Sequence, residues 1–541
     1  MFLRQIRCVI ALALFAALFA GCGKSATAPP KPAVSSPAPL ETIARIHWLG
    51  KNRISADTNA ATFMKIWDLP ESVKLEAQTL DKLSVAPWRF LHGETNHSTT
   101  NLLRPLLDDL ANEESYVEIR RATNSTNAAD EIVLAIRLNN QRAALWQTNL
   151  AAVVESLTGM TAANSQPSGT NTAPGWSLRK HHAPNLIELT RAGDWTLVGA
   201  AQDHNALLDE TLARIGHEGV PFPIEVTNSW LEAGGDLSRL ASAMGFADNK
   251  SSNFPQVYFT VLGSAQYVLT HGEITLPGKA YVKLDPWNIP TNLIDGDLTS
   301  FTAIRGFKPW LSSSKTWTNL QIGPPPDQFY IWAVRAFPME TYFAAPLSDA
   351  SNAVSRFSDL VLKKGSPWFA TNSLAGFRRS ATFNGLSWHG LPYAAPFLQS
   401  IDGKGGAFVF GGYFQPTASS QPPPPALLKE ILNHTNLVYY DWELTGLRVD
   451  QWLHLGQFIR FVSGKAQLPF DSATTAWIRA VSSQLGNCGT EITETEPGQL
   501  SFTRNSTVGL TAIELHLLAD WLESPNFPYG LHTLLAPPSE Q

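Results

Sequence analysis

The string GLSWHG places a serine, Ser387, two residues before a histidine, His389. A hydrolase nucleophile elbow has the pattern G-x-S-x-G, and its second glycine leaves room where strand and helix approach closely. Here His389 occupies the position of that glycine, and residues two apart on a strand merely share a face. The pattern therefore favours an ordinary strand over a catalytic serine.

Two adjacent histidines, His181 and His182, could in principle bind zinc. Neighbouring residues on a strand point to opposite faces, so a single metal site could easily use only one of them. Neither H-E-x-x-H nor C-x-x-C occurs, and Asp295, Gly296 and Asp297 lack the further oxygen ligands of a calcium loop. We expect neither a metal nor a cofactor, and we interpret Asp297 as the N-cap of a helix that begins at Leu298.

The residues Gly23, Lys24 and Ser25 resemble the end of a phosphate-binding loop. Such a loop needs a glycine five residues before Gly23, and that position is Leu18. The preceding segment instead has Arg4 and Arg7 followed by an apolar run from 9 to 20, which is typical of an export signal. The run is shorter than the ~20 residues that a membrane-spanning helix needs.

The junction Phe19, Ala20, Gly21, Cys22 resembles the lipobox of bacterial membrane lipoproteins, with Phe19 where leucine is commonest. The resemblance covers residues 1–22 and implies cleavage before Cys22, lipidation of its thiol, and a membrane partner through that anchor. Ordinary secretion with cleavage nearby, or an uncleaved anchor, are the alternatives, and each leaves the body outside the cytoplasm. Gly23 is not the aspartate associated with inner-membrane retention in families resembling this one, which implies an outer-membrane address facing the periplasm.

Cysteine content and charge limit the remaining chemistry. Cys8 leaves with the signal and Cys22 would be acylated, so Cys488 alone remains and no intrachain disulfide is expected. Removing Arg4 and Arg7 leaves 38 of the 40 Lys and Arg against 46 Asp and Glu, a formal charge of −8. This balance gives no electrostatic basis for binding nucleic acid.

Residues 22–44 are rich in proline, at positions 29, 30, 32, 37 and 39, and predict an extended tether between anchor and body. The body that follows has several segments that recur in the same order. The recurring pairs are EIVLAIRLNN at 131 with QFYIWAVRAF at 328, where Ala135 matches Ala333 at an offset of 198, GWSL at 175 with GLSW at 385 (offset 210), WTLVGAA at 195 with AFVFGGY at 407 (offset 212), and ALLDETL at 206 with ALLKEIL at 426 (offset 220). A further pair, SWLEAGGDLSRL with DWELTGLRVDQWL, matches Trp230 with Trp442 at an offset of 212. A weaker pair is the helix-like ATFMKIW at 61 with SFTAIRGFKPW at 300.

These recurrences predict a duplication, with a first repeat at 45–290 and a second at 291–541, after a signal peptide at 1–21. In each copy a helical pattern follows the first matched strand; the second such helix is expected to end at Lys363, Lys364 and Gly365. Tight turns such as Pro497–Gly498 between strands favour antiparallel pairing. The predicted fold class is α+β: two similar halves, each a mainly antiparallel sheet with helices packed on one face.

A C-terminal helix is expected after Thr511, where Thr511 and Glu514 have the spacing of a capping box. The body as a whole faintly resembles uncharacterised secreted bacterial proteins built from similar halves, a likeness that implies no activity.

Aromatic and basic residues offer weaker signals. The strand LVYYDWEL at 437–444 could stack on sugars, but core packing is the preferred interpretation of its rings. Arg137 and Arg335 recur in both copies, and we interpret them as solvent-edge residues of equivalent strands.

The sequence therefore predicts a lipid-anchored envelope protein of binding or scaffolding type without catalytic activity, with an envelope protein, a glycan or an apolar ligand as partner. A carrier for an apolar ligand is one form of this hypothesis. An envelope hydrolase whose site is assembled from residues distant in sequence is the alternative.

Overall fold

The structure is a computed structural model of the whole chain. It describes residues 40–93, 97–122, 130–158, 163–165, 173–179, 186–202, 204–222, 226, 228–243, 254–277, 284–320, 323–335, 340–369, 376–389, 395–403, 406–416, 424–462, 472–524 and 527–528. Contacts between Cα atoms divide the chain into two compact units. Unit 1 comprises residues 1–277, 469–480 and 517–541, and unit 2 comprises residues 278–468 and 481–516.

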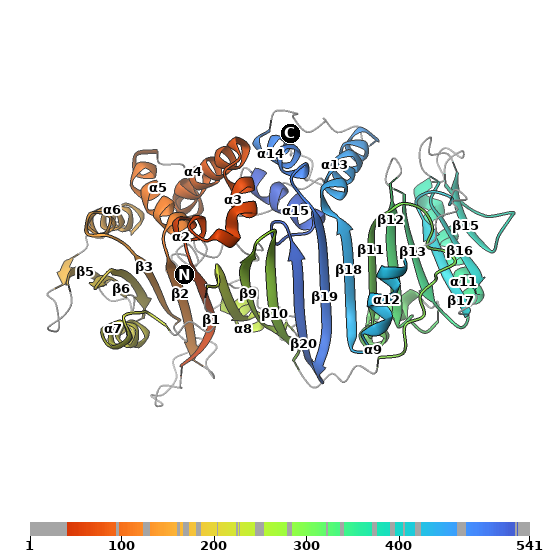
Figure 1. The fold of residues 1–541 in the computed structure, drawn as a ribbon, viewed down its shortest axis with the longest axis horizontal. Coiled ribbons are helices and arrows are strands. Elements are labelled where there is room, and N and C mark those ends of the chain that lie inside the picture. Colours follow the sequence, from red (N-terminus) through yellow and green to blue (C-terminus); the bar gives the residue numbers. More distant parts are fainter. Residues whose placement is uncertain are drawn as a thin grey trace. The chain divides into compact units, whose positions relative to one another are not determined.

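The described part of unit 1 contains ten strands, which all pair antiparallel with their neighbours (Figure 1). Their order across the sheet is β4-β5-β6-β7-β3-β2-β1-β8-β9-β10. Their bounds are β1 Leu40–Trp48, β2 Ser115–Ala122, β3 Glu131–Arg137, β4 Ala163–Ser165, β5 Ala173–Arg179, β6 Leu186–Ala192, β7 Trp195–Ala201, β8 Leu231–Asp236, β9 Gln256–Ser264 and β10 Tyr267–Thr275.

Helices cover both faces of this sheet, because its central strands are apolar on both sides. On β3, Ile132, Leu134 and Ile136 face one core with helices α4 to α6. The alternate residues Val133 and Ala135 face a second core with helix α7. Figure 1 shows α6 and α7 on opposite sides of the strands. The helical bounds are α2 Lys51–Ser55, α3 Ala61–Trp67, α4 Pro70–His92, α5 His97–Asn112, α6 Asn140–Thr158, α7 Ala206–Glu218 and α8 Leu237–Ala243.

Unit 2 also has ten described strands in one antiparallel arrangement. Their order is β14-β15-β16-β17-β13-β12-β11-β18-β19-β20. Counted from the N-terminus of each unit, this is the same order as in unit 1. The bounds are β11 Leu298–Arg305, β12 Gln328–Val334, β13 Thr341–Pro346, β14 Gly376–Arg379, β15 Gly385–His389, β16 Phe397–Gly403, β17 Gly406–Gly412, β18 Leu437–Leu444, β19 Asn487–Glu496 and β20 Gln499–Ser506.

The sheet of unit 2 is apolar on both faces as well. One face carries a core of stacked aromatic rings, with Trp332 and Phe410 5.9 Å apart, and is covered by Leu427 and Ile431 of α12. The other face is contacted by α11, which packs on β14 to β17. The helical bounds are α9 Lys308–Ser313, α10 Lys315–Leu320, α11 Ala350–Phe369, α12 Pro425–Asn433 and α13 Thr445–Val462. Two more helices cross a unit boundary: α14 Ala473–Ser482 belongs to unit 1 up to residue 480, and α15 Ala512–Glu523 belongs to unit 2 up to residue 516.

The α+β class with antiparallel sheets is confirmed, whereas the prediction of helices on one face only is wrong. Strands with apolar residues at successive positions, such as β3, need cover on both sides, so helices are required on both. Two further predictions fail for local reasons. Leu298 begins strand β11 rather than a helix, and α11 continues past Lys363 and Gly365 to Phe369.

The matched segments correspond unevenly to positions in the two sheets. GWSL and GLSW lie in β5 and β15, each the fifth strand of its unit, and WTLVGAA and AFVFGGY lie in β7 and β17, each the seventh. EIVLAIR forms β3, the third strand of unit 1, whereas QFYIWAV forms β12, the second strand of unit 2. The two segments of this pair therefore do not occupy corresponding positions. ATFMKIW is a helix and SFTAIR a strand, so that pair is wrong.

The expected boundaries also differ from the observed units. Strand β1 begins at Leu40, so the last residues of the predicted tether, 40–44, belong to the sheet. The described C-terminal residues 472–480, 517–524 and 527–528 belong to unit 1. The reason is packing on α4: Lys82 donates to the carbonyl of Leu522 at 2.6 Å, and Trp477 donates to Ser72 at 3.1 Å.

The capping box of α15 is confirmed, since the Thr511 backbone N–H donates to Glu514 at 2.8 Å and the Glu514 N–H donates to Thr511 Oγ1 at 3.4 Å. α12 begins at Pro425, where proline suits the first helical turn.

Two glycines at corresponding strands share one steric role. A Cβ at Gly175 of β5 would lie 2.1 Å from the carbonyl oxygen of Leu189, and one at Gly385 of β15 would lie 1.9 Å from that of Leu398. The contacting atoms are backbone, so neither site can admit a side chain without moving a strand.

We expect Gly175→Ala and Gly385→Ala each to destabilise the protein by about 1–3 kcal/mol, because the added methyl overlaps a fixed backbone oxygen. Urea unfolding followed by circular dichroism measures the effect. Gly216→Ala in α7 and Gly456→Ala in α13 are matched controls with no atom within 4 Å of the added Cβ. They should be neutral or stabilising by up to about 1 kcal/mol; equal losses in controls and test variants would contradict the steric explanation.

Candidate functional site

Unit 2 contains a cavity of about 530 Å³ on the face of its sheet opposite the aromatic core. Its wall comes from three sources: strands β11, β12, β13, β16 and β17, helices α9 and α10 with their flanks, and helix α11. The lining residues share an apolar character and are Ile304, Phe307, Trp310, Leu311, Trp317, Pro326, Phe329, Phe343, Ala345, Leu347, Ala353, Val354, Phe357, Leu398 and Val409.

The alternation of the strands places these side chains. On β13, Tyr342 and Ala344 belong to the aromatic core, whereas Phe343 and Ala345 line the cavity. The same division holds on β12, where Phe329 faces the cavity and stacks on Phe343 at 5.6 Å between ring centroids. Helix α11 completes the wall with Ala353, Val354 and Phe357, which are spaced three and four apart on one helical face.

The cavity reaches solvent beside helix α9. Trp310 both lines it and is 71% exposed, which is unusual for the largest apolar side chain. Trp317 of α10 donates its indole N–H to the carbonyl of Gly323 at 2.9 Å, so its ring can face the cavity without an unpaired polar atom.

The corresponding face of unit 1 is filled instead. There Ile46 of β1 pairs with Val117 of β2, and Leu134 of β3 pairs with Val198 of β7; all pack with α4, α5 and α6 in one core. In unit 2 the matching strands place Ile304 opposite Phe329, and Ala345 opposite Val409. Between its first and second strands unit 1 has residues 51–112, with helices α2 to α5, whereas unit 2 has only α9 and α10 within 308–320. The cavity thus lies on the face that longer helices occupy in unit 1.

This wall determines what the cavity can hold. Apart from the indole groups of Trp310 and Trp317, no lining side chain carries a polar atom, so a charged or hydrogen-bonding group placed inside would lose water without compensation. Its volume lies within the range of about 300–1,000 Å³ that is usual for small-molecule sites. The arrangement can bind an apolar group and offers no general acid, base or nucleophile.

Two buried carboxyl groups elsewhere in unit 2, those of Asp441 and Glu443, have raised pKa values. Asp441 and Glu443 lie on one face of β18; Thr302 donates to Asp441 at 2.6 Å and the backbone N–H of Ala512 donates to Glu443 at 2.7 Å. Burial raises the pKa of Glu443 to about 7, and the nearby Asp441 charge adds to the increase. Burial also raises the pKa of Asp441. Neither residue lines the apolar cavity, and both are packed against protein groups.

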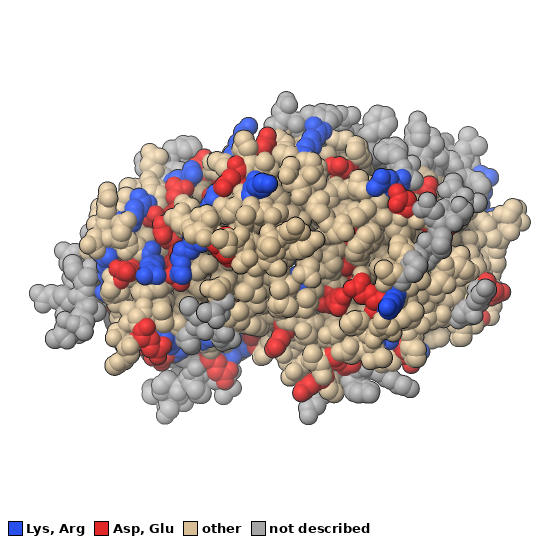
Figure 2. Space-filling view, viewed as in Figure 1, with Lys and Arg blue, Asp and Glu red and all other residues tan. Residues whose placement is uncertain are grey.

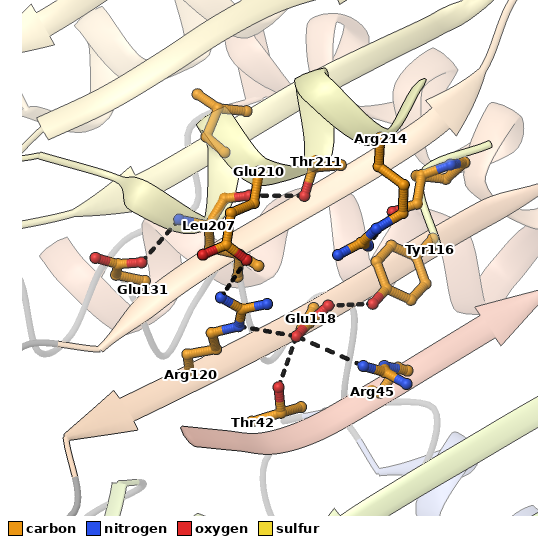
Figure 3. A network of polar contacts seen from close by, with 12 residues as sticks. Thr42, Arg45, Tyr116, Glu118, Arg120, Glu131, Leu207, Glu210, Thr211 and Arg214 are labelled. Carbon is orange, nitrogen blue, oxygen red and sulfur yellow. Dashed lines mark hydrogen bonds and ion pairs between the residues drawn. The ribbon is translucent and has the colours of Figure 1, made fainter. Parts of the chain in front are cut away.

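Unit 1 contains a polar network that fixes helix α7 to its sheet (Figure 3). Glu118 is fully buried and accepts hydrogen bonds from Thr42 at 2.6 Å, Arg120 at 3.0 Å and the hydroxyl of Tyr116. Burial raises the pKa of Glu118, but these hydrogen bonds and the nearby arginines outweigh it and lower the pKa below the ordinary value. Arg120 also donates to Glu210 of α7 at 2.6 Å. The carboxylates of Glu118 and Glu210 thus bind donors of the protein itself, which is the arrangement of a structural network.

The residues singled out from the sequence are not brought together. Ser387 of β15 lies opposite Arg378 and Phe397 on the neighbouring strands, neither of which can act as a general base. His389 ends the same strand, and His181, His182 and Cys22 lie outside the described residues. Cys488 is buried in β19, where burial raises its thiol pKa to about 12.

The expected roles of the arginines and aromatic residues are partly confirmed. The side chains of Arg137 and Arg335 are 51% and 59% exposed, and Arg335 pairs with Asp297 at 3.3 Å. Their strands, β3 and β12, are not equivalent in the two sheets. In LVYYDWEL, Leu437 and Tyr440 belong to the aromatic core, with Trp442 packed against it, which agrees with the core interpretation.

The cavity itself was missed, although QFYIWAV and TYFAAP carry a signal for it. Continuous apolar strands need cover on both faces, and the segment between 305 and 328 is too short for helices like α4 and α5. Within the described residues no group of three or more His, Cys, Asp or Glu side chains is placed to hold a metal ion. On the face shown in Figure 2, basic and acidic side chains are interspersed.

No protein-family model matches the chain, and neither the curated proteins nor the solved structures include a match to it. Among the described helices, none is both long and apolar enough to span a membrane.

The raised pKa of Glu443 predicts how stability depends on pH. The folded state keeps this carboxyl protonated up to about pH 7, whereas an unfolded chain releases the proton near its ordinary value of about 4.3. The folded state therefore binds more protons between these values, and the stabilisation, full below about pH 4, is lost as pH rises through 7.

Glu443→Gln keeps an acceptor for the Ala512 N–H and removes the titration. We expect the melting temperature of the variant to exceed that of the wild type at pH 8, with the difference shrinking or reversing at pH 5, as measured by thermal denaturation. Glu496→Gln, at the exposed end of β19, is the matched control and should follow the wild-type profile. Parallel profiles for Glu443→Gln and wild type would contradict the assignment.

Proposed function

We propose that this protein is a lipid-anchored protein of the bacterial cell envelope that binds a fatty acyl chain in the apolar cavity of unit 2. The observation that carries the proposal is a wall made only of apolar side chains, open to solvent at Trp310, on a sheet face that helices fill in unit 1. A long acyl chain has no internal polar group and fits such a wall. An extended peptide would place unpaired backbone N–H and C=O groups inside it.

We further propose that the two units arose by duplication of one α+β unit. The support is their common strand order, together with Gly175 and Gly385 in the same steric role on the fifth strand of each. Under this proposal the helical segment between the first two strands was long in one copy and short in the other. The shorter segment does not fill the face of the sheet, and the space that remains is the proposed acyl site. The proposed function therefore depends on the difference in helix length between the two copies.

The anchor proposal rests on the N-terminal segment, which lies outside the described residues. Its support is the export-like signal ending in Phe19, Ala20, Gly21 and Cys22, followed by a proline-rich tether. Placement on the outer membrane, facing the periplasm, is the address this proposal takes. An envelope protein that binds acyl chains there would work by binding and presentation rather than by catalysis.

Filling the cavity should abolish acyl binding. Ala353→Phe projects a ring from α11 into the space beside Phe357, and we expect the affinity for cis-parinaric acid, followed by its fluorescence, to fall at least tenfold. Energy transfer from the wall residues Trp310 and Trp317 reports the same site. Ala213→Phe, at an exposed position of α7 in unit 1, is the matched control and should bind as the wild type does. Unchanged affinity in Ala353→Phe would exclude this cavity as the site.

Removing the thiol should remove the anchor without unfolding the body, because Cys22 lies 18 residues before the first strand at Leu40. We expect Cys22→Ser to abolish incorporation of an alkyne-labelled fatty acid and to shift the protein from the detergent phase to the aqueous phase. Mass spectrometry of the wild-type N-terminus should give an acylated Cys22. An unmodified Cys22 still joined to Gly21 in envelope fractions would refute lipidation, and Ser25→Ala serves as the control.

A further inference from the structure

Unit 1 has a cavity of its own, of about 390 Å³, and its wall combines charged and polar side chains with apolar ones. It lies over one face of the strands β1, β8, β9 and β10, which pair in that order. One cross-strand row joins Arg45, Gly234, Tyr258 and Glu273 through successive pairs. The next row joins His47 to Glu232. Residues from both rows line the cavity.

Gly234 makes room for a ligand at the centre of the first row. Its neighbours Arg45 and Tyr258 carry long side chains, and a Cβ at Gly234 would already lie 3.3 Å from the ring of Tyr258. The glycine therefore leaves the floor of the cavity open between larger side chains.

His47 provides the observation that points to a ligand. It is 2% exposed, and its Nε2 lies 3.2 Å from Glu114. Burial raises the pKa of Glu114, but the bonds to His47 and Arg53 outweigh it and keep that pKa below the usual range. Glu114 is therefore ionised and accepts the Nε2 proton.

Nδ1 of His47 has no partner among the described residues, and in the neutral ring with its proton on Nε2 this nitrogen is a hydrogen-bond acceptor. A buried acceptor without a donor costs free energy, and native proteins rarely retain one without a reason. The ring lines the cavity beside Phe222, whose centroid is 4.7 Å from it. A donor brought by a ligand would satisfy Nδ1.

The charges of the wall indicate what kind of donor this is. Arg239 pairs with Glu41 at 2.7 Å and Arg45 with Glu118 at 3.8 Å, so both cations are already compensated by carboxylates. The cavity thus presents no free cation for an anionic ligand. Glu273 adds an exposed carboxylate to the wall. Glu232 adds its Oε2, since its Oε1 already accepts from Ser229 at 2.6 Å and from the Val226 N–H at 3.1 Å. A neutral molecule with several hydroxyl donors fits this set best.

We propose that the unit 1 cavity binds a neutral saccharide of one or two rings, with His47 Nδ1 accepting a hydrogen bond from a sugar hydroxyl. Glu232 and Glu273 accept from further hydroxyls, and Tyr258 contributes an aromatic surface against which a sugar ring can pack. This site is separate from the acyl cavity and does not depend on the proposed function.

The test is saturation-transfer difference NMR on the full-length protein in detergent, with maltose, cellobiose and N,N′-diacetylchitobiose as probes. We expect at least one of them to bind. His47→Phe, which keeps an aromatic ring and removes the acceptor, should weaken that binding at least tenfold. Glu273→Ala, at an exposed position on β10, should weaken it several-fold. Glu218→Ala, an exposed carboxylate at the end of α7 away from the wall, is the matched control and should bind like the wild type.

No binding by any of the three probes would overturn the proposal, as would equal binding by wild type and both test variants. In that case His47 Nδ1 is satisfied by water alone. If His47→Phe does not fold, by circular dichroism, the comparison of Glu273→Ala with Glu218→Ala decides. Binding of cis-parinaric acid in the same samples reports the acyl site separately, so failure of one proposal leaves the other measurable.

Discussion

The central strands of each unit carry apolar side chains on both faces, and the structure of the unit depends on covering both faces. β3 is buried at six of its seven positions, and β12 and β13 carry aromatic or aliphatic residues on both faces. A sheet of this kind cannot leave one side to water, so each unit must supply cover above and below it. In unit 1 the cover is complete near its centre, with α4 to α6 on one face and α7 on the other. In unit 2 the aromatic core is covered by α12, and the cover on the opposite face leaves a cavity.

The charged side chains that the sheets bury depend on hydrogen-bond partners within the protein. Glu118 and Glu114 are held in unit 1 by arginine and hydroxyl donors, which allow carboxylates to remain ionised out of water. The buried charge of Arg305 in unit 2 is stabilised in a different way. Its guanidinium donates hydrogen bonds to the backbone carbonyls of Leu437, Asp285 and Thr435. For Glu443, burial raises the pKa, and the hydrogen bond from Ala512 together with the nearby Arg448 charge does not offset it. Partners therefore decide which buried groups keep their charge, because burial alone would neutralise all of them.

Sequence patterns predicted many of the helices and strands, but they did not predict which faces of the sheets are covered or where the cavities lie. Antiparallel strands, the hairpin at Gly498 and the capping box of Thr511 follow from local patterns, since turns and caps depend on nearby residues. The failures came where tertiary context decides. Leu298 follows a good capping residue, Asp297, yet it begins β11 and pairs with Val334 of β12. Gly365 resembles a helix end, yet α11 continues through it. The two-sided apolar pattern of QFYIWAV and TYFAAP indicates that both faces need cover, but the lining of the cavity and the unpaired nitrogen of His47 depend on strands brought together from distant parts of the chain.

The two cavities show how one strand order can serve different chemistry. Both lie on the faces of ten-stranded antiparallel sheets, and their walls differ because alternate residues of a strand face opposite sides. In unit 2 the wall residues are those that would otherwise contact helices, such as Phe329 and Phe343, so the empty space is apolar. In unit 1 that face is filled, and the remaining space lies over β1, β8, β9 and β10, where Arg45, His47 and Glu232 point from the other side of the sheet than Ile46. The same strand order thus supports an apolar wall in unit 2 and a wall of mixed polarity in unit 1, because the side chains that line the two cavities differ.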